Sequence, residues 1–253
     1  MRAIIIAAGM GSRLEHHTEE RPKCMVEVAG RSILSYQLEA LRAHGVDDIH
    51  IVRGYLSEKL VVDGATYWEN PDFRNNNILL SLFCAEPAMQ GAFVTTYSDI
   101  VYGPEVVHKL MESPDDVALV VDRRWHEAYE GREDHPPEQA ELTVVSGDRV
   151  TAVGKHVSQD DNPLGEFIGL AKFSAEGGRW LRETYQRVRS THGDDDPFQA
   201  APRFRKAYQT DLIEEMIRDG HPVGYIPIDG SWREIDTVED LARVSQWPLT
   251  IGS

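Results

Sequence analysis

The chain of 253 residues is long enough to bury a full hydrophobic core, and its 41% hydrophobic and 27% charged residues are typical of a globular protein. Its formal net charge of −16 opposes the phosphate backbone of DNA or RNA, so we expect no nucleic-acid partner. The two cysteines, Cys24 and Cys84, have no spacing that suits zinc, which favours a reduced, cytoplasmic protein.

The first predicted element is a buried strand, Ile4–Ala8. This apolar run is far shorter than a membrane span, so we expect no membrane partner. A helix follows, with apolar residues at helical spacing between Ile33 and Leu41, and His44-Gly45 ends it. Asp48–Val52 is the second strand. This order predicts a right-handed βαβ unit, whose parallel strands carry a ligand at their carboxyl ends.

The remaining elements predict an α/β fold that is Rossmann-like, with a mixed, mainly parallel sheet flanked by helices and a small antiparallel insertion on the substrate side. Strands are expected at Ala92–Thr96, Val117–Val121, Leu142–Val145, Val150–Val153, Ile168–Phe173 and Val223–Pro227. Helices are expected at Ile78–Glu86, Pro104–Met111, Ala175–Val188, Tyr208–Gly220 and Val238–Val244. The turn Ser146–Asp148 indicates a hairpin. Glu127–Glu141 and Thr191–Arg205 are interpreted as insertions.

A glycine-rich loop follows the first strand and has the composition of a phosphate-binding loop. Arg13 can grip a triphosphate in a bidentate manner, and Lys23 lies ten residues further on, in a segment where it is expected to be exposed. The Walker pattern needs Gly-Lys-Ser/Thr, and the dinucleotide fingerprint needs a third glycine where this chain has Leu14. Neither a P-loop kinase nor a dehydrogenase fits. The small residues and backbone N–H groups that would approach the phosphates belong to Ala7, Ala8, Gly9, Gly11 and Ser12.

The pattern Ala7-Ala-Gly-x-Gly-Ser-Arg13 with Arg21-Pro-Lys23 resembles the signature of nucleotidyltransferases that act on sugar phosphates and phospho-alcohols. Later segments are similar to the phosphocholine, inositol-phosphate and phosphonate cytidylyltransferases, namely Ser81–Ala85, Ser98–Tyr102, Asp122–Arg132, Ala140-Glu141, Gly154-Lys155 and Gly165–Phe173.

This resemblance spans nearly the whole chain and implies a nucleotide-diphospho-sugar transferase-like fold. It also implies a Mg²⁺-dependent transfer of CMP from CTP to a small phosphorylated or phosphonate-bearing alcohol or amine, with release of pyrophosphate. We therefore expect one domain over residues 1–253, in which residues 1–122 bind the nucleotide and residues 123–253 bind the acceptor.

The resemblance also implies individual roles. Arg13 and Lys23 would be catalytic cations on the triphosphate, and Asp99 and Asp236 would hold Mg²⁺; taken singly, each carboxylate has a turn or N-cap as its alternative. Lys155 would orient the attacking phosphate or phosphonate, or else be a solvated lysine. On the nucleotide side, the resemblance adds Asn77, whose alternative is a helix cap, and Ser98.

Trp125 and Tyr129 lie four residues apart, so on a helical turn they share a face and can cup an ammonium group by cation–π attraction. Their alternative is core packing. Polar residues nearby in the sequence favour a substrate pocket that also includes Asp122, Arg132, Glu141 and Glu166. Asp211 is either a first-turn helix carboxylate or a ligand for a substrate amine. The ten histidines show no ligand spacing, and we expect none to be needed for the chemistry.

Two other functions stay open. One is a sugar-1-phosphate nucleotidylyltransferase that uses UTP, dTTP or GTP. The other is a catalytically silent, nucleotide-binding regulatory domain, against which the presence of Lys23, Asp99 and Asp236 argues. Departures from the pattern of the relatives, at His17, Arg53 and His156-Val157, leave the identity of the acceptor open. The sequence does not decide between a monomer and a homodimer.

Overall fold

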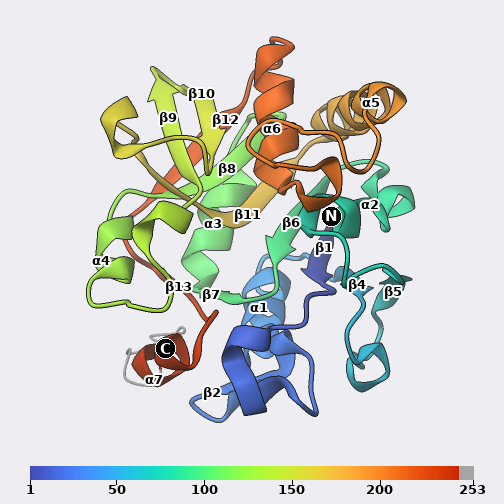
Figure 1. Ribbon diagram of the computed structural model, residues 1–253, viewed down its shortest axis with the longest axis vertical. Coiled ribbons are helices and arrows are strands. Elements are labelled where there is room, and N and C mark those ends of the chain that lie inside the picture. Colours follow the sequence, from blue (N-terminus) through green and yellow to red (C-terminus); the bar gives the residue numbers. More distant parts are fainter. Residues whose placement is uncertain (245–253) are drawn as a thin grey trace.

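A nine-stranded sheet forms the centre of the protein, whose computed structural model describes residues 1–244 (Figure 1). Along the main path the strands follow the order β10-β9-β11-β6-β1-β4-β5, and β8 lies between β11 and β12. The strands are β1 (Arg2–Ala7), β4 (Asp48–Arg53), β5 (Thr66–Glu69), β6 (Phe93–Tyr97), β8 (Val117–Asp122), β9 (Leu142–Ser146), β10 (Arg149–Gly154), β11 (Gly165–Phe173) and β12 (Gly224–Ile228).

Strand direction divides the sheet into two parts. β1 pairs in parallel with β4 and β6, and β4 pairs in parallel with β5. β11 is antiparallel to β6, β8 and β9, and β9 forms an antiparallel hairpin with β10. The carboxyl ends of β1 and β6 and the amino end of β11 consequently meet at one edge of the sheet, where the expected ligand site lies.

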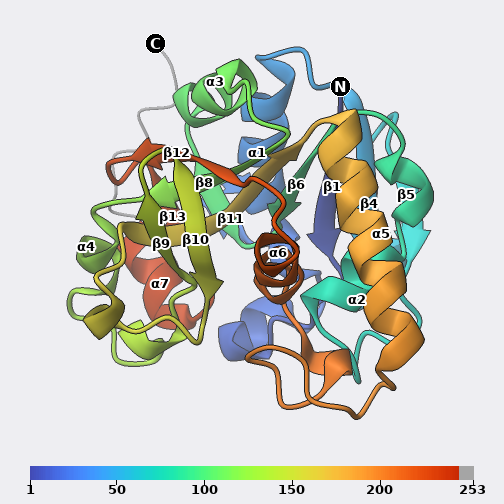
Figure 2. The same cartoon turned by 90° about the horizontal axis from the view of Figure 1, so that it is seen from above.

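Helices cover both faces of the sheet (Figure 2). The first face carries α1 (Ile33–Arg42) and α3 (Pro104–Glu112), and the opposite face carries α2 (Ile78–Phe83), α5 (Ala175–Thr191) and α6 (Gln209–Arg218). In β1, Ala3 and Ile5 pack with the α1 side, whereas Ile4 and Ile6 pack with the α2 side. A strand that is buried on both faces is apolar along its whole length instead of alternating apolar and polar residues. The continuous apolar run Ile4–Ala8 therefore predicts β1 directly.

Short strands at the site edge complete the fold and were not foreseen. β2 (Glu27–Val28) pairs with β3 (Arg31–Ser32), and β7 (Ile100–Tyr102) pairs antiparallel with β13 (Trp232–Glu234). Strands of two or three residues are too short to show periodicity. Two further helices are α4 (Trp125–Tyr129) and α7 (Val238–Val244). The β7–β13 ribbon matters most, because it joins segments from the middle and the late part of the chain.

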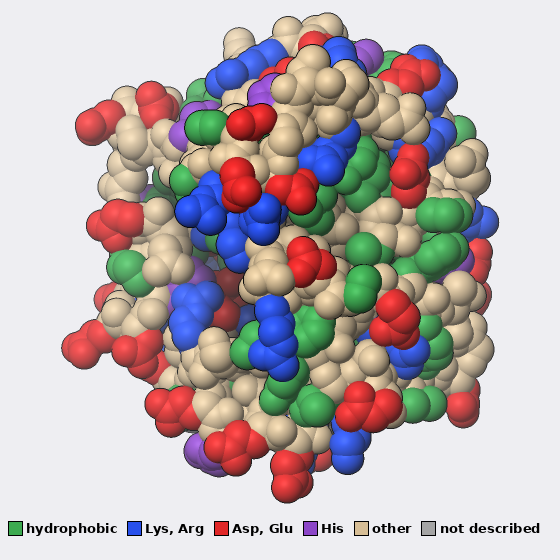
Figure 3. All heavy atoms as spheres, turned by 45° about the vertical axis from the view of Figure 1, so that its right-hand side comes forward, with side chains coloured by type: hydrophobic (Ala, Val, Ile, Leu, Met, Phe, Trp, Pro, Cys, Tyr) green, Lys and Arg blue, Asp and Glu red, His purple; other side chains and the backbone are tan. Residues whose placement is uncertain are grey.

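On the face drawn in Figure 3, Lys and Arg side chains lie among Asp and Glu side chains, and a group of Lys and Arg side chains left of centre adjoins acidic ones. None of the helices within residues 1–244 combines the length and the apolar character needed to cross a membrane.

We expect Gly169→Ala to destabilise the protein by about 3 kcal/mol. Gly169 has φ +86° where the register between β11 and β8 shifts, and an added Cβ would lie 2.5 Å from Cδ2 of Tyr97. Gly220→Ala is the matched control, because Gly220 has φ +85° with nothing within 4 Å, so that backbone strain of about 1 kcal/mol is the whole expected loss. Urea unfolding measures both, and equal losses would contradict the role of the Tyr97 contact.

Candidate active site

An open cavity of about 310 Å³ lies at the site edge of the sheet. One side of the cavity consists of the loop after β1, the end of β6 and the start of α2, and the other side comes from the segments around α4, β11 and β13. The polar residues that line it are Ser12, Arg13, Lys23, Asn76, Asn77, Ser81, Tyr97, Ser98, Asp99, Tyr129, His135, Gln139, Glu141, Lys155, Glu166, Tyr208, Glu234 and Asp236.

Lys23 joins the two carboxylates that were predicted to bind metal. Its Nζ donates to Oδ2 of Asp99 at 2.7 Å and to Oδ1 of Asp236 at 2.6 Å. Only 8% of Lys23 is exposed, so the expectation of an exposed lysine is wrong: the loop packs over it. Gly11, at φ +61°, is the residue that passes over it, and a Cβ there would lie 2.9 Å from Cβ of Lys23.

The charges around Asp236 favour its ionised form. Burial opposes ionisation, but Lys23, the contact with His135 and the guanidinium of Arg13 together hold the pKa of Asp236 well below its usual range. Nδ1 of His135 lies 3.1 Å from Oδ2 of Asp236, and Nη2 of Arg13 contacts the same oxygen. Burial also lowers the pKa of Lys23, yet Asp99 and Asp236 outweigh it and raise that pKa above its ordinary value.

The residues in this part of the cavity fit a divalent metal ion. Oδ1 of Asp99 is buried and accepts no hydrogen bond, so one carboxylate oxygen is left for a ligand. His135, Glu234 and Asp236 each offer a ligand atom, and these three atoms lie within 4.8 Å of one another. Carboxylate oxygens are the donors that Mg²⁺ prefers.

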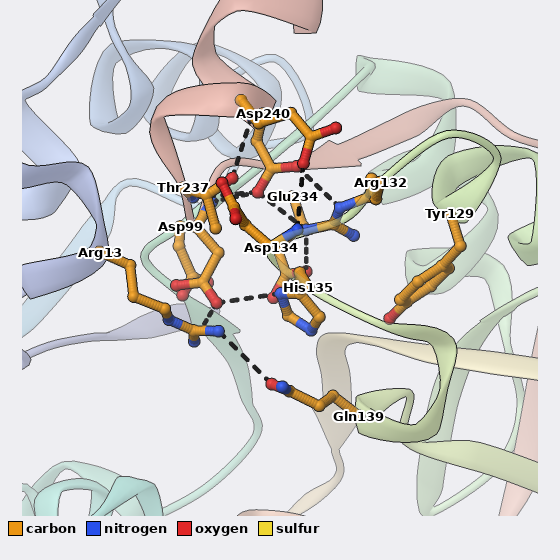
Figure 4. Close-up of polar contacts among 12 residues, drawn as sticks. Arg13, Asp99, Tyr129, Arg132, Asp134, His135, Gln139, Glu234, Thr237 and Asp240 are labelled. Atoms are coloured by element: carbon orange, nitrogen blue, oxygen red, sulfur yellow. Dashed lines mark hydrogen bonds and ion pairs between the residues drawn. The ribbon is translucent and has the colours of Figure 1, made fainter.

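A buried ion pair fixes the backbone that carries Asp236 (Figure 4). Oδ2 of Asp240 accepts from the backbone N–H groups of Asp236 and Thr237, both at 3.0 Å. The backbone N–H of Asp240 donates to Oγ1 of Thr237, so that Thr237 rather than Asp236 caps α7. Arg132 holds Asp240 in turn, with Nε 2.7 Å from Oδ1 and Nη2 2.8 Å from Oδ2.

On the other side of the cavity, two buried glutamates each accept a hydrogen bond from a tyrosine. The hydroxyl of Tyr129 donates to Oε1 of Glu166 at 2.6 Å, and that of Tyr97 donates to Oε2 of Glu141 at 3.3 Å. Burial raises the pKa of Glu141 to about 7 and the pKa of Glu166 well above its ordinary value. Oε2 of Glu166 is buried without a hydrogen-bond partner. This side of the cavity thus offers carboxyl groups that are partly protonated at neutral pH. One of their oxygens, Oε2 of Glu166, is free to bond to a ligand.

Lys155 contacts Tyr208 and lies near Glu141. Its Nζ lies 3.2 Å from the Tyr208 hydroxyl and 4.2 Å from the centre of that ring. Burial lowers the pKa of Lys155, but the nearby Glu141 outweighs it, so the pKa is raised and the ammonium stays charged.

Most of the residues singled out from the sequence meet in this cavity. The structure brings together Ala8, Gly9, Gly11, Ser12, Arg13, Lys23, Asn77, Ser98, Asp99, Tyr129, Glu141, Lys155, Glu166 and Asp236. The amide of Asn77 donates to the backbone oxygen of Lys206 at 3.0 Å, which ties the start of α2 to the segment before α6. The other predicted site residues lie outside the cavity lining.

Each residue outside the lining has a structural partner. Ala7 is buried within β1. Asp122 accepts hydrogen bonds from the backbone N–H groups of Arg124 and Gly230 and from Nε1 of Trp232. Trp125 packs in a small core with Ala140, Leu142 and Val157. Arg132 holds Asp240, and Asp211 accepts from the backbone N–H groups of Ala200 and Tyr208 at the start of α6.

His135 and Glu234 are site residues that the sequence reasoning missed. Glu234 precedes Asp236 by two residues, but a single glutamate at that position has no spacing that marks it as a ligand. His135 lies in an acidic insertion without ligand spacing, and we expected no histidine to take part in the chemistry. Its contact with Asp236 depends on how the insertion folds back over β13, for which the sequence contains no signal.

Comparisons with known proteins point to one family. Residues 3–234 match the family model described as MobA-like NTP transferase domain. The chain is 32% identical to the CTP:phosphoglutamine cytidylyltransferase of Campylobacter jejuni, over 95% of this chain and 98% of that protein. It is 35% identical to the choline-phosphate cytidylyltransferase of Streptococcus pneumoniae, over 37% of this chain and 43% of that protein.

A solved structure, that of the inositol-1-phosphate CTP transferase from T. maritima, superimposes with a TM-score of 0.71 at 20% identity, covering 100% of this chain and 98% of that chain. The fold class and the family resemblance predicted from the sequence are thereby confirmed.

Arg132→Met is expected to lower the free energy of unfolding by about 3 to 5 kcal/mol, because it leaves Asp240 buried without its cation. Arg218→Met is the control: it breaks a pair with Glu214 in which 59% of the arginine side chain is exposed, and the loss should stay below about 1 kcal/mol. Unfolding in urea measures both. An Arg132→Met protein with wild-type stability and a weakened acceptor affinity would instead favour direct contact with the substrate.

Glu141 predicts a pH dependence of stability. Its folded pKa of about 7 exceeds the ordinary 4.5, so the folded protein holds a proton that the unfolded chain releases. Between these pH values the free energy of unfolding therefore falls as pH rises, and Glu141→Gln removes this contribution. We expect the wild type to lose stability relative to Glu141→Gln from pH 5 to pH 8, measured as the difference in Tm. A constant difference would contradict the assignment.

Proposed function

Because the chain belongs to the MobA-like NTP transferase family, we propose that it is a CTP-dependent cytidylyltransferase that joins CMP to a small phosphorylated or phosphonate-bearing acceptor. The observation that carries the proposal is the shared placement of the loop Ala8–Arg13, Lys23, Asp99 and Asp236 on one side of a cavity, with Lys155 lining it as well. The C. jejuni relative, matched along almost its whole length, is named for CTP and phosphoglutamine.

In the proposed reaction, an oxygen of the acceptor phosphate or phosphonate attacks the α-phosphorus of CTP. The bond from that phosphorus to the bridging oxygen breaks, and pyrophosphate leaves with the electron pair. The acceptor oxygen is already anionic at neutral pH, so no side chain has to remove a proton. What the protein must supply is alignment and positive charge.

Arg13 and Lys23 supply that charge on the nucleotide side. Residues of the loop line the cavity, and Arg13 contacts Asp236 and Oε1 of Gln139, which lies 3.4 Å from its Nη1. A triphosphate offers Arg13 oxygens of higher charge than the Gln139 amide, so we expect the guanidinium to exchange Gln139 for phosphate. Lys23 stays between its two carboxylates and faces the charge that develops on the leaving group.

Mg²⁺ belongs to the proposal as the ion that Asp99 and Asp236 would hold. When bound there, it would neutralise phosphate oxygens and so lower the repulsion that an anionic acceptor meets. The oxygen of Asp99 that accepts no hydrogen bond and the strongly ionised Asp236 support this assignment.

The base and the acceptor occupy opposite sides of the cavity in this proposal. Asn77 and Ser98 lie on the nucleotide side, and the side-chain oxygen of Asn77 can accept from the exocyclic amine of cytosine, because its amide nitrogen already donates to Lys206. On the other side, Lys155 orients the acceptor phosphate, and Glu141, Glu166 and Tyr129 meet a polar or cationic group of the acceptor. The proposal also includes a cytoplasmic location and the absence of a nucleic-acid partner, and the net charge of −16 supports the second of these.

The test is pyrophosphate release by the purified protein with CTP, Mg²⁺ and a panel of acceptors that includes phosphoglutamine, phosphocholine, 2-aminoethylphosphonate and 2-hydroxyethylphosphonate. Lys23→Met should lower kcat about 100-fold or more, since it removes a cation that acts on the transition state. Lys109→Met, on the exposed side of α3, is the control and should keep wild-type turnover.

Because Lys23 is buried between carboxylates, a circular-dichroism spectrum and a thermal melt of Lys23→Met must accompany the kinetics. Release with UTP, dTTP or GTP but not with CTP would overturn the nucleotide assignment. No release with any nucleotide and any acceptor of the panel would overturn the enzyme.

A further inference from the structure

A second chamber of about 340 Å³ adjoins the active-site cavity. It lies between the start of α6 and the segment of residues 192–208 that leads into it, drawn in orange in Figure 1. Asn77, Lys155 and Tyr208 line both spaces, so the two are neighbours that share a wall. The roles proposed above for Lys155 place this chamber next to the acceptor rather than next to the loop that holds the triphosphate.

Two of the residues that line the chamber are lysines that form no ion pair with the part of the chain that the structure describes. Lys155 and Lys206 both line it, and within residues 1–244 neither has a carboxylate oxygen within 4.0 Å of its Nζ. Asp211 lines it as well, but its oxygens accept from the backbone N–H groups of Ala200 at 3.1 Å and Tyr208 at 2.7 Å. In a chain with a net charge of −16, two lysines that line one chamber without an ion pair to a described residue within 4.0 Å indicate an anionic ligand.

The walls of the chamber suit a short carbon chain. The residues at positions 200–202, Ala200, Ala201 and Pro202, are small and apolar and carry no side-chain hydrogen-bonding group. A ligand that enters from the active-site cavity would pass Lys155 and Tyr208, cross this apolar wall and meet Lys206. An anion at that end of the ligand is what Lys206 can bind.

We propose that this chamber receives the end of the acceptor that is remote from phosphorus, and that Lys206 binds a carboxylate there. The acceptors are then phosphorylated or phosphonate-bearing compounds that also carry a carboxylate, as amino-acid derivatives do. This inference rests on the proposed cytidylyltransferase function and adds the substrate class that its acceptor side selects.

The test uses pairs of acceptors that differ only by one carboxylate. O-phosphoserine is compared with O-phosphoethanolamine, and 2-amino-4-phosphonobutyrate with 3-aminopropylphosphonate, each with CTP and Mg²⁺. We expect kcat/KM to be about tenfold higher for the carboxylate-bearing member of at least one pair, as one charge-assisted contact would give. Lys206→Gln should raise KM for that member about tenfold at unchanged kcat and leave KM of its partner unchanged.

Arg203→Gln is the matched control. It removes a cation from the same segment, but its side chain is 61% exposed, lies 3.7 Å from Asp195 and does not line the chamber. Arg203→Gln should leave KM close to the wild-type value for both members of each pair. Isothermal titration of the preferred acceptor into wild-type protein and Lys206→Gln gives the same comparison without turnover.

The outcomes separate the two proposals. No pyrophosphate with any acceptor overturns the function and the inference with it. An active enzyme that prefers neither carboxylate-bearing acceptor overturns the inference alone, and so does a preference that Lys206→Gln leaves unchanged. Loss of affinity for both members of a pair in Lys206→Gln would assign Lys206 to the phosphate and also overturn the carboxylate role.

Discussion

The site depends on a single ammonium group, that of Lys23, placed between two carboxylates. Asp99 and Asp236 would repel each other if they were brought into a half-buried cavity alone, and the loop that carries Lys23 is what makes their approach favourable. The backbone assists, because Ile235 donates its N–H to the carbonyl of Asp99 at 2.8 Å. Three features keep these side chains together. They are Gly11 in the loop, the β7–β13 ribbon and the ionised state of Asp236.

The two sides of the cavity differ in how burial affects charge. At Asp236, cations outweigh burial and favour the ionised form. At Glu141 and Glu166, burial dominates, and both hold their protons more strongly than exposed carboxyl groups do. The two glutamates therefore add less negative charge to the cavity than their number suggests.

Sequence reasoning predicted the parts of the fold that a local pattern specifies. The buried run of β1, the loop after it and Lys23 are encoded within a few dozen residues, and periodicity located nearly all the longer strands and helices. It did not separate Asp122, Trp125 and Arg132 from the residues that line the cavity. A carboxylate, an indole or a guanidinium suits a buried structural bond as well as a substrate contact, and only the position of the partner decides between them.

The contacts of α7 determine when the site can form during synthesis of the chain. Asp236 obtains its position from Asp240, which Arg132 holds from a segment more than 100 residues earlier in the chain. A ribosome that has released residues 1–230 has released the glycine-rich loop, Lys23 and Asp99, but not the second carboxylate or the aspartate that orients it. A nascent chain of that length would present Lys23 with one carboxylate instead of two, so the site can be completed only after residues 236–240 have been synthesised.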